Sequence, residues 1–278
     1  MIKLTVEYDG APYVGWQVQP SGPSVQEALE QALARLCAVP REELEVIAAG
    51  RTDSGVHARG QVISLEPRGL GAKLPLRAFT AGLNGILPAT IAVVHAEEAP
   101  GRFDARRWAI GKRYVYSIRN APLRSPLWRA RAWEIRRPLD AGAMRAGLPH
   151  LLGRHDFTSL RASDCPAKNP VRELTRLSLD ADARDPAVLH LTVEGTAFLK
   201  HMVRNIVGTL VEIGHGKRAP DSLPALLAAR DRGRAGVTAP PHGLVLEQVF
   251  YPEPLRDPRP PRAQELAAAP VPAEDDVE

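Results

Sequence analysis

Hydrophobic and polar positions follow two alternating patterns along the first hundred residues. Strict alternation or short apolar runs predict β-strands at residues 2–9, 44–50, 60–66 and 90–98. Apolar residues that recur every three or four positions predict helices at 23–37 and 76–87. The first of these helices also has Ser24 and Glu27 at the spacing of a capping box. The predicted order is β-α-β-β-α-β.

The remainder of the chain repeats this order without obvious sequence identity to the first part. Strands are predicted at 112–120, 171–181, 187–195 and 243–251, and helices at 140–152, 197–214 and 221–231. Two ferredoxin-like (βαββαβ) halves would each place a largely antiparallel sheet under helices on one side. The patterns therefore predict an α+β protein whose two halves meet at a central cleft with room for a long polyanion.

The same patterns divide the chain into two domains and a tail. Residues 1–105 form the predicted N-terminal α+β half, and residues 106–252 form the C-terminal half. From about residue 253 onward the sequence is rich in Pro and acidic residues and cannot bury enough apolar surface to fold. Residues 253–278 are therefore expected to be a disordered tail.

Composition narrows the class of protein. With 278 residues and 44% hydrophobic residues, the chain can build its core without a metal or a disulfide. Cys37 and Cys165 lie outside any CxxC pair and are expected to be reduced thiols. The N-terminus enters a strand without a signal peptide, and no apolar run reaches about 18 residues. We expect a cytoplasmic protein that has no membrane partner.

Positive charge is concentrated in one stretch. Arg102–Arg137 contains eleven Lys or Arg residues and only two acids, with Trp and Tyr residues interleaved. Such a run can simply be a solvated face. However, cations beside aromatic rings also provide phosphate neutralisation and base stacking, which are what a nucleic-acid surface needs. The charge pattern favours RNA or DNA as a partner and makes the predicted cleft basic.

A short glycine-rich loop, AAGRTDSGVHARGQV at residues 48–62, carries the first candidate for chemistry. Asp53 lies between Arg51 and His57 where two predicted strands meet. Asp53 could cap backbone N–H groups in a turn and pair with a nearby Arg, which is a structural role. Asp53 and His57 could also share a metal, but no third ligand lies nearby in the sequence. The third possibility is a reactive carboxylate.

The predicted helix at 197–214 carries the second candidate. Its apolar residues cover most of its circumference, so the helix is expected to be largely buried. Arg204 sits within it and needs an anion or a set of acceptors, because an unpaired buried guanidinium is very costly. Glu194 on a neighbouring strand is one possible partner. The chain has no GxGxxG or P-loop motif and no GxSxG, so an enzyme of this sequence would work with side chains alone.

Five segments in order along the chain are characteristic of a known family. They are EYDGAPYVGWQ (Glu7–Gln17), AGRTDSGVHARGQV (Ala49–Val62), GKRYVY (Gly111–Tyr116), DFTSLRA (Asp156–Ala162) and FLKHMVRNIVGTLVEIG (Phe198–Gly214). Together they resemble the bacterial tRNA pseudouridine synthase A (TruA) family. The resemblance implies a two-domain α+β homodimer that needs neither cofactor nor metal. It further implies isomerisation of uridine to pseudouridine at nucleotides 38, 39 and 40 of the tRNA anticodon arm.

The resemblance also implies roles for individual residues. Asp53 is the catalytic nucleophile, Arg204 pairs with it, and Tyr114 packs on the target base and takes part in proton transfer. Leu244 supports the base, and Arg51 contacts RNA and helps to fill the space left by the flipped nucleotide. Further RNA contacts are implied at Arg102, Phe103, Arg106, Arg107 and Cys165.

Two other functions fit part of the sequence. A non-catalytic RNA-binding protein would explain the basic stretch equally well, but not a buried Arg helix together with a glycine-rich Asp loop. A glycosidase with a single carboxylate would lack the second acid that such enzymes usually use. In the synthase the carboxylate attacks the sugar, promotes proton loss there or attacks the base. In each case it has to be ionised and within about 3.5 Å of its target.

Overall fold

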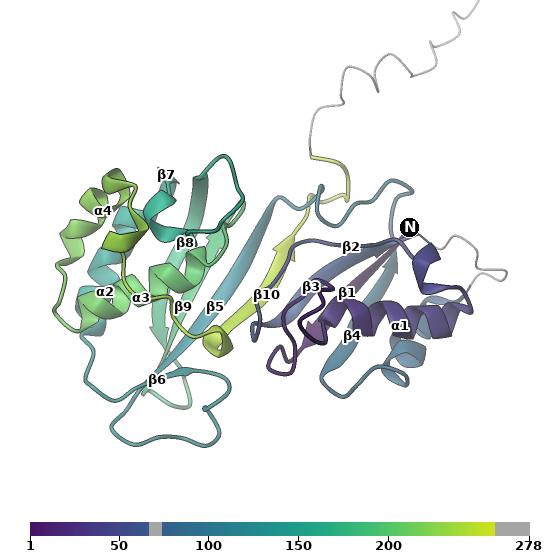
Figure 1. Cartoon of the computed structure of the whole chain (residues 1–278), viewed down its shortest axis with the longest axis horizontal. Helices are drawn as coiled ribbons and strands as arrows, with labels where there is room; N and C mark the ends of the chain where they lie inside the picture. The colour runs from purple at the N-terminus through teal and green to yellow at the C-terminus, as the bar shows by residue number, and fades with distance from the viewer. Residues whose placement is uncertain (67–73, 259–278) are drawn as a thin grey trace, which may run out of the picture.

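The computed structural model describes residues 1–66 and 74–258, and their strands form one mixed sheet (Figure 1). The strands are β1 (Ile2–Tyr8), β2 (Val46–Ala48), β3 (His57–Leu65), β4 (Ile91–Glu98), β5 (Gly111–Asn120), β6 (Trp133–Ile135), β7 (Gly153–Asp156), β8 (Val171–Ala181), β9 (Val188–Gly195) and β10 (Leu244–Phe250). The helices are α1 (Val25–Cys37), α2 (Ala141–Gly147), α3 (Met202–Gly214) and α4 (Leu223–Ala229). The prediction of a mixed protein with a mostly antiparallel sheet is confirmed.

The sheet runs without interruption through both halves of the chain. Its order is β4-β1-β3-β10-β5-β9-β8-β7, with β2 paired to β3 and β6 paired to β5. Pairing is antiparallel except between β5 and β6 and between β10 and β3, where Val245 aligns with His57. Because β10 lies between β3 and β5, the end of the chain joins the N-terminal strands to the C-terminal strands. The loop before β3 therefore lies beside the start of β10.

Helices cover the sheet at both ends of the long axis. Figure 1 shows α1 over the N-terminal strands and α2, α3 and α4 gathered at the opposite end. In α1, the Ser24 hydroxyl accepts a hydrogen bond from the Glu27 N–H at 3.2 Å, as the predicted cap requires. The helix buries Val25, Leu29 and Leu33 against the sheet. This periodic apolar face is why the sequence pattern located α1 well.

Several predicted boundaries are wrong for local reasons. The helix predicted at 197–214 begins only at Met202, because His201 has a left-handed backbone with φ of 60° that an α-helix cannot contain. The strand predicted at 44–50 is reduced to β2, and the helix predicted at 76–87 contains a π-turn at Ala78–Gly82. The short strands β6 and β7 were not predicted, because three or four residues show no clear periodicity.

Helix α3 is buried around almost its whole circumference, as predicted. Only Arg204 and Glu212 among its residues are not buried. A Cβ atom on Gly208 would lie 1.7 Å from the carbonyl oxygen of Val237, so another stretch of backbone crosses the helix at this glycine. The helix is thus held between the sheet and the 235–239 segment, which leads into β10.

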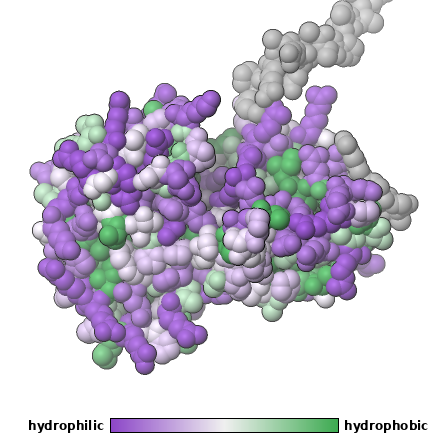
Figure 2. Space-filling model, viewed as in Figure 1, coloured by the Kyte–Doolittle hydropathy of each residue, from purple (hydrophilic) through white to green (hydrophobic). Residues whose placement is uncertain are grey.

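The aromatic residues of the basic stretch are less exposed than predicted. Trp108, Tyr114 and Tyr116 are core residues at 7%, 8% and 0% exposure, so most of each ring is covered by protein. Trp128 and Trp133 are half-buried. The face in Figure 2 is mostly hydrophilic, with hydrophobic residues in small separate areas. None of the helices in the described part of the chain is long and apolar enough to span a membrane.

Two further expectations concern the cysteines and the tail. Cys37 is buried, Cys165 is half-buried, and neither is in a disulfide. Residues 253–258 continue from β10 without regular secondary structure. The remainder of the expected tail, 259–278, lies outside the described residues.

Candidate active site

Asp53 occupies the first position of a tight turn. The Val56 N–H donates to the Asp53 carbonyl oxygen at 3.1 Å, and Gly55 has φ of 75° at the third position of the turn. A positive φ at that position is the requirement of a type II turn, which glycine meets without steric cost. The turn thus explains Gly55 in the GRTDSGVH segment. Its backbone presents the Asp53 carboxylate, whose side chain is 29% exposed, at the sheet surface.

Neighbouring residues hold the Asp53 loop rigidly. The Thr52 hydroxyl is hydrogen-bonded to the Tyr8 hydroxyl at 2.8 Å, and the Thr52 carbonyl accepts from the Trp16 N–H at 3.1 Å. The Gln61 side chain donates to the Gly50 carbonyl at 2.8 Å. Burial raises the pKa of Tyr8 to about 12, so it remains a neutral phenol at physiological pH. These bonds fix the loop from both sides before any substrate binds.

His57 has a structural role: its ring links three segments of the chain, a contact that we call the clasp. His57 is not part of a metal site within the described residues. The Gly10 N–H donates to its Nδ1 at 3.0 Å, while its Nε2 lies 3.1 Å from the carbonyl oxygens of Ala130 and His242. This pattern suits a neutral ring with its proton on Nε2. The Asp9 carboxylate, whose Oδ1 lies 3.0 Å from Nδ1, favours the charged ring, but burial outweighs it and lowers the pKa of His57, which favours the neutral form. The clasp joins the N-terminal half to two segments of the C-terminal half.

Arg204 and Asp53 meet across 151 positions of sequence, as expected. The Arg204 Nη1 donates to Asp53 Oδ2 at 3.2 Å, and the Arg204 Nε donates to the Ala239 carbonyl at 2.7 Å. The guanidinium side chain is 13% exposed. Arg204 contacts the carboxylate through Nη1 alone, because its Nε is committed to the backbone. Arg204 is the third residue of α3.

The alternative partner for Arg204 is engaged elsewhere. Glu194 on β9 accepts a hydrogen bond from Arg113 Nε at 2.7 Å and lies 3.7 Å from Arg176. The interpretation that paired Arg204 with Glu194 is therefore wrong. The carboxylate that satisfies the half-buried guanidinium is Asp53, with the Ala239 carbonyl as a second acceptor.

His201 is a second neighbour of Asp53 and was not among the site residues expected from the sequence. Its Nε2 lies 3.5 Å from Asp53 Oδ2, and its side chain is 28% exposed. Burial lowers the pKa of His201 and outweighs the opposing effect of the Asp53 charge. The ring is therefore neutral at physiological pH, and Arg204 is the permanent cation beside the carboxylate. The left-handed backbone of His201 is the local signal of a special position.

The two tyrosines of GKRYVY have different environments. Tyr116 is fully buried and its hydroxyl donates to the Pro240 carbonyl at 2.8 Å. Tyr114 packs edge-on against Phe198, with ring centroids 5.0 Å apart, and its hydroxyl makes no hydrogen bond within the described residues. Burial raises the pKa of Tyr114, and its electrostatic interactions with Tyr8 and Asp53 raise it further. Tyr114 is therefore the tyrosine with an available phenol near Asp53.

The other expected contact residues are dispersed. Leu244 is buried at the start of β10, opposite Tyr116. Arg51, Arg102, Arg106 and Arg107 are exposed, and none forms an ion pair within residues 1–66 and 74–258. Cys165 is half-buried in the loop between Ala162 and Val171.

Phe103 is a correction to the expected RNA contacts. It is 1% exposed and packs against the rings of Trp108 and Tyr251, with centroids 5.5 and 5.4 Å away. It is a core residue whose side chain cannot reach bound RNA. Its place in the RFDARR segment instead anchors the neighbouring arginines to the sheet.

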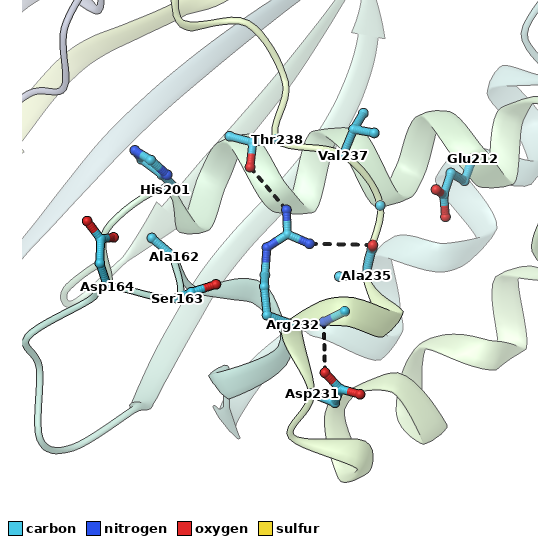
Figure 3. Close-up of a pocket in the computed structure, with 12 residues that line it drawn as sticks. Ala162, Ser163, Asp164, His201, Glu212, Asp231, Arg232, Ala235, Val237 and Thr238 are labelled. Atoms are coloured by element: carbon cyan, nitrogen blue, oxygen red, sulfur yellow. Dashed lines mark hydrogen bonds between the residues drawn. The ribbon is translucent and has the colours of Figure 1, made fainter.

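A pocket of about 690 Å³ is lined by His201, a neighbour of Asp53, but not by Asp53 itself (Figure 3). His201 and Asp164 lie on one side of it, while Arg232 is held by Thr238 at 3.0 Å and by the Ala235 carbonyl at 3.4 Å. Asp53, Tyr114 and Arg204 are not among its lining residues. Its polar side chains largely satisfy one another, so the pocket itself carries no evident chemistry. Within the described residues, no group of three His, Cys, Asp or Glu could hold a metal ion.

Comparison with known proteins gives the family of the chain. A family model described as tRNA pseudouridine synthase matches residues 4–106 and 148–252. A tRNA pseudouridine synthase A of Myxococcus xanthus is 53% identical over 251 residues, which are 90% of this chain and 91% of the relative. A protein of the same name from Geotalea uraniireducens is 48% identical over 250 residues, 90% of this chain and 99% of the relative.

Solved structures give a weaker likeness. A chain of the archaeal box H/ACA sRNP Nop10–Cbf5 complex is 13% identical with a TM-score of 0.34, and the match covers 76% of this chain and 44% of that chain. A TM-score this low does not establish a shared fold. The family match and the two relatives span both the Asp53 loop and the Arg204 helix. The chain belongs to the tRNA pseudouridine synthase family.

Proposed function

We propose that this enzyme isomerises uridine to pseudouridine at nucleotides 38, 39 and 40 of the tRNA anticodon arm. The observation that carries the proposal is the contact between Arg204 and Asp53, which brings the two halves together at one carboxylate. That carboxylate lies in the GRTDSGVH loop, inside the region matched by the family model. The reaction breaks the N-glycosidic bond of uridine, turns the base and forms a C–C bond to the same sugar.

Asp53 is the proposed nucleophile. The type II turn fixes its backbone, and Arg204 directs one carboxylate oxygen, which leaves the other oxygen without a hydrogen-bond partner among the described residues. A fixed carboxylate that is partly open to solvent can reach an incoming nucleotide without rearranging the loop. Attack on the sugar, proton removal from the sugar and attack on the base all use this same oxygen. The arrangement supports each of these routes equally.

Tyr114 and Leu244 are the proposed supports for the flipped base. Extrusion of a base from its stack costs a few kcal/mol, and packing against an aromatic ring recovers part of that cost. Tyr114 offers its ring at the edge of the core and a phenol that remains protonated near neutral pH. It is therefore suited to donate a proton or hydrogen bond during the reaction. Leu244 adds apolar surface at the start of β10.

The chain also supports the proposed two-domain plan. Within residues 1–105 the strands lie in the order β4-β1-β3-β2, and within 106–252 in the order β10-β5-β9-β8. If each set is numbered along its own half, leaving out β6 and β7, both orders are 4-1-3-2, which is that of a ferredoxin-like unit. We propose that the basic groove for the anticodon arm lies between these units, rimmed by Arg51, Arg102, Arg106 and Arg107, with the Cys165 loop beside it. Phe103 is left out of this interface.

The homodimer and the cytoplasmic location are also proposed, and their support is the family resemblance. A non-catalytic RNA-binding protein would use the same basic groove. It would, however, have no need of a carboxylate held between Arg204 and His201. The two functions therefore differ in what they require of Asp53.

Pseudouridine mapping of total tRNA tests the proposed function. Transcripts or tRNA from cells lacking this activity are incubated with wild-type protein or with Asp53→Asn, and pseudouridine is located at each nucleotide. The proposal expects new pseudouridine at 38, 39 and 40 with the wild-type protein and none with the variant. Binding of tRNA by wild-type protein without any new pseudouridine would support the RNA-binding alternative and overturn the enzyme.

A further inference from the structure

Lys112 is a further cation on the face of β5 that carries Tyr114. It precedes Tyr114 by two positions, so the two side chains point to the same side of the sheet. Its ammonium packs against the Asp53 loop, since a Cβ atom on Gly50 would lie 2.5 Å from Lys112 Nζ. The absence of a side chain at Gly50 is therefore what leaves room for this cation.

The Lys112 ammonium has no acceptor within the described residues. It is half-buried, yet it takes part in no hydrogen bond or ion pair there. The neighbouring Arg113, which points to the opposite side, is by contrast paired with Glu194 at 2.7 Å. Removing a cation from water without an anionic partner is costly, so an unpaired ammonium at this place calls for a ligand.

The charges around Lys112 indicate the class of that ligand. Arg106 is its charged neighbour from the preceding segment, Arg51 follows Gly50 in the loop, and the cross-strand residues Gly195 and Val249 carry no charge. Burial and, to a smaller extent, the positive charge of Arg106 lower the pKa of Lys112 to about 8. A concentration of positive charge without a carboxylate fits a phosphate group, and a Lys ammonium is a compact point charge for one.

We propose that Lys112, with Arg106 beside it, binds a backbone phosphodiester of the tRNA next to the target nucleotide. The proposal rests on the proposed function and adds a contact point to it. The site is three residues along the loop from Asp53 and two along β5 from Tyr114. A phosphate held there fixes the backbone on one side of the nucleotide that has to leave its stack.

Binding measurements with matched lysine variants test this site. Affinity for tRNA is measured at several salt concentrations for the full chain carrying Asp53→Asn, to prevent turnover, alone and with Lys112→Met or Lys217→Met. Lys217 is an exposed lysine beyond the C-terminal end of α3 and serves as the control. Lys112→Met should weaken binding about tenfold and reduce the slope of log affinity against log salt by about 1. Lys217→Met should change neither.

A second pair of variants keeps the test independent of any folding defect. Gly50→Ala places a methyl group where the ammonium packs, and it should weaken binding about as much as Lys112→Met. In the double variant the two effects should not add, because both remove the same contact. Additive losses would mean that Gly50 and Lys112 act separately and would contradict the proposal.

The dependence on pH gives the sharpest readout. In the protein without tRNA the pKa of Lys112 is about 8. The affinity for tRNA should therefore fall as the pH rises from 7 to 9, because the Lys112 ammonium loses its proton and its charge. Lys112→Arg keeps its charge and should show a flatter profile. Unchanged affinity, salt slope and pH profile in Lys112→Met would overturn the phosphate site. Failure of the proposed function would show differently, as wild-type protein that binds tRNA but forms no pseudouridine.

Discussion

At the scale of single residues, one guanidinium holds the candidate nucleophile in place. Arg204 is oriented by the Ala239 carbonyl at Nε and contacts Asp53 through Nη1. The fork of donors in Arg allows both bonds at once, whereas Lys has a single nitrogen on a flexible stem. The carboxylate thus gains a fixed direction as well as a compensating charge.

Substitutions of Arg204 can separate the effect of its positive charge on Asp53 from the effect of its hydrogen-bond geometry. Arg204→Lys should lower the rate at saturating tRNA by about a hundredfold, because a small misplacement of the nucleophile costs that much. Its melting temperature should remain closer to wild type than that of Arg204→Ala, which leaves Asp53 without its cation. Single-turnover kinetics and thermal unfolding measure the two effects. A lysine variant with wild-type turnover would mean that only charge matters at this position.

Tyr114 and Tyr116 can be distinguished by removing one oxygen atom from each. Tyr114→Phe keeps the ring but loses the hydroxyl, so it should bind tRNA normally and react more slowly. It should unfold at the wild-type temperature, because the Tyr114 hydroxyl makes no hydrogen bond within the described residues. Tyr116→Phe loses the bond to the Pro240 carbonyl and should cost about 1 kcal/mol of stability with little effect on rate. The reverse outcome would show that the roles assigned here to Tyr114 and Tyr116 are exchanged.

At the scale of elements, the position of α3 depends on a glycine. Gly208 and Gly236 approach so closely that a Cβ on either would meet the other segment within 2.7 Å. The 235–239 segment can therefore cross the helix in direct backbone contact and carry the Ala239 carbonyl to Arg204. Packing of α3 and orientation of Asp53 are linked through this crossing.

Gly208→Ala should disturb both the packing of α3 against the 235–239 segment and the orientation of Asp53. Its methyl group would lie 1.7 Å from the Val237 oxygen, so the 235–239 segment has to move, at an expected cost of about 3 kcal/mol. Gly101→Ala is the matched control, because a Cβ there meets nothing within 4 Å and should change stability by less than about 0.5 kcal/mol. Denaturant unfolding compares the two. Equal stability of both variants would contradict the crossing.

Most elements could be predicted from the sequence, but their junctions could not. The apolar period of α1 and the alternation of β1 are local signals, and both elements lie close to where they were predicted. The start of α3 depends on the backbone of His201, and β2 ends early where the Asp53 loop is hydrogen-bonded to Tyr8 and Gln61. Such tertiary constraints leave no periodic pattern in the sequence.

The candidate site was predictable only in part for a similar reason. Asp53 and Arg204 could be found, because a carboxylate in a glycine-rich loop and an arginine in an apolar helix are both unusual in sequence. His201 and Lys112 could not, because their environments come from contacts with distant segments. Phe103 was misassigned because neighbouring arginines do not show which side chain enters the core.

At the scale of the whole molecule, three buried or half-buried histidines link stability to pH. His57, His201 and His215 all have pKa values lowered mainly by burial. In the unfolded chain they titrate near about 6.5, so below that pH the unfolded state binds more protons than the folded state. Their contribution to stability is complete above about pH 7 and is lost as pH falls through 6.5 toward the folded values.

The melting temperature should therefore decrease between pH 7.5 and pH 5.5. His57→Gln should flatten this decrease, because the clasp between Gly10, Ala130 and His242 then no longer titrates. The lowered pKa values of Asp156, Asp164 and Asp182 act only below about pH 4 and do not interfere in this range. A melting temperature that is constant or rises on acidification would contradict the assignment of neutral buried histidines.

The central claim is that one carboxylate, Asp53, performs the chemistry on tRNA. Its most direct test is tritium release from tRNA labelled at C5 of uridine, because formation of the C–C bond displaces the hydrogen at that carbon. Wild-type protein should release tritium in step with pseudouridine formation. Asp53→Asn, which keeps the shape of the side chain and removes the nucleophile, should release less than about a thousandth as fast while binding tRNA within about tenfold of wild type. Release by Asp53→Asn near the wild-type rate would contradict the claim.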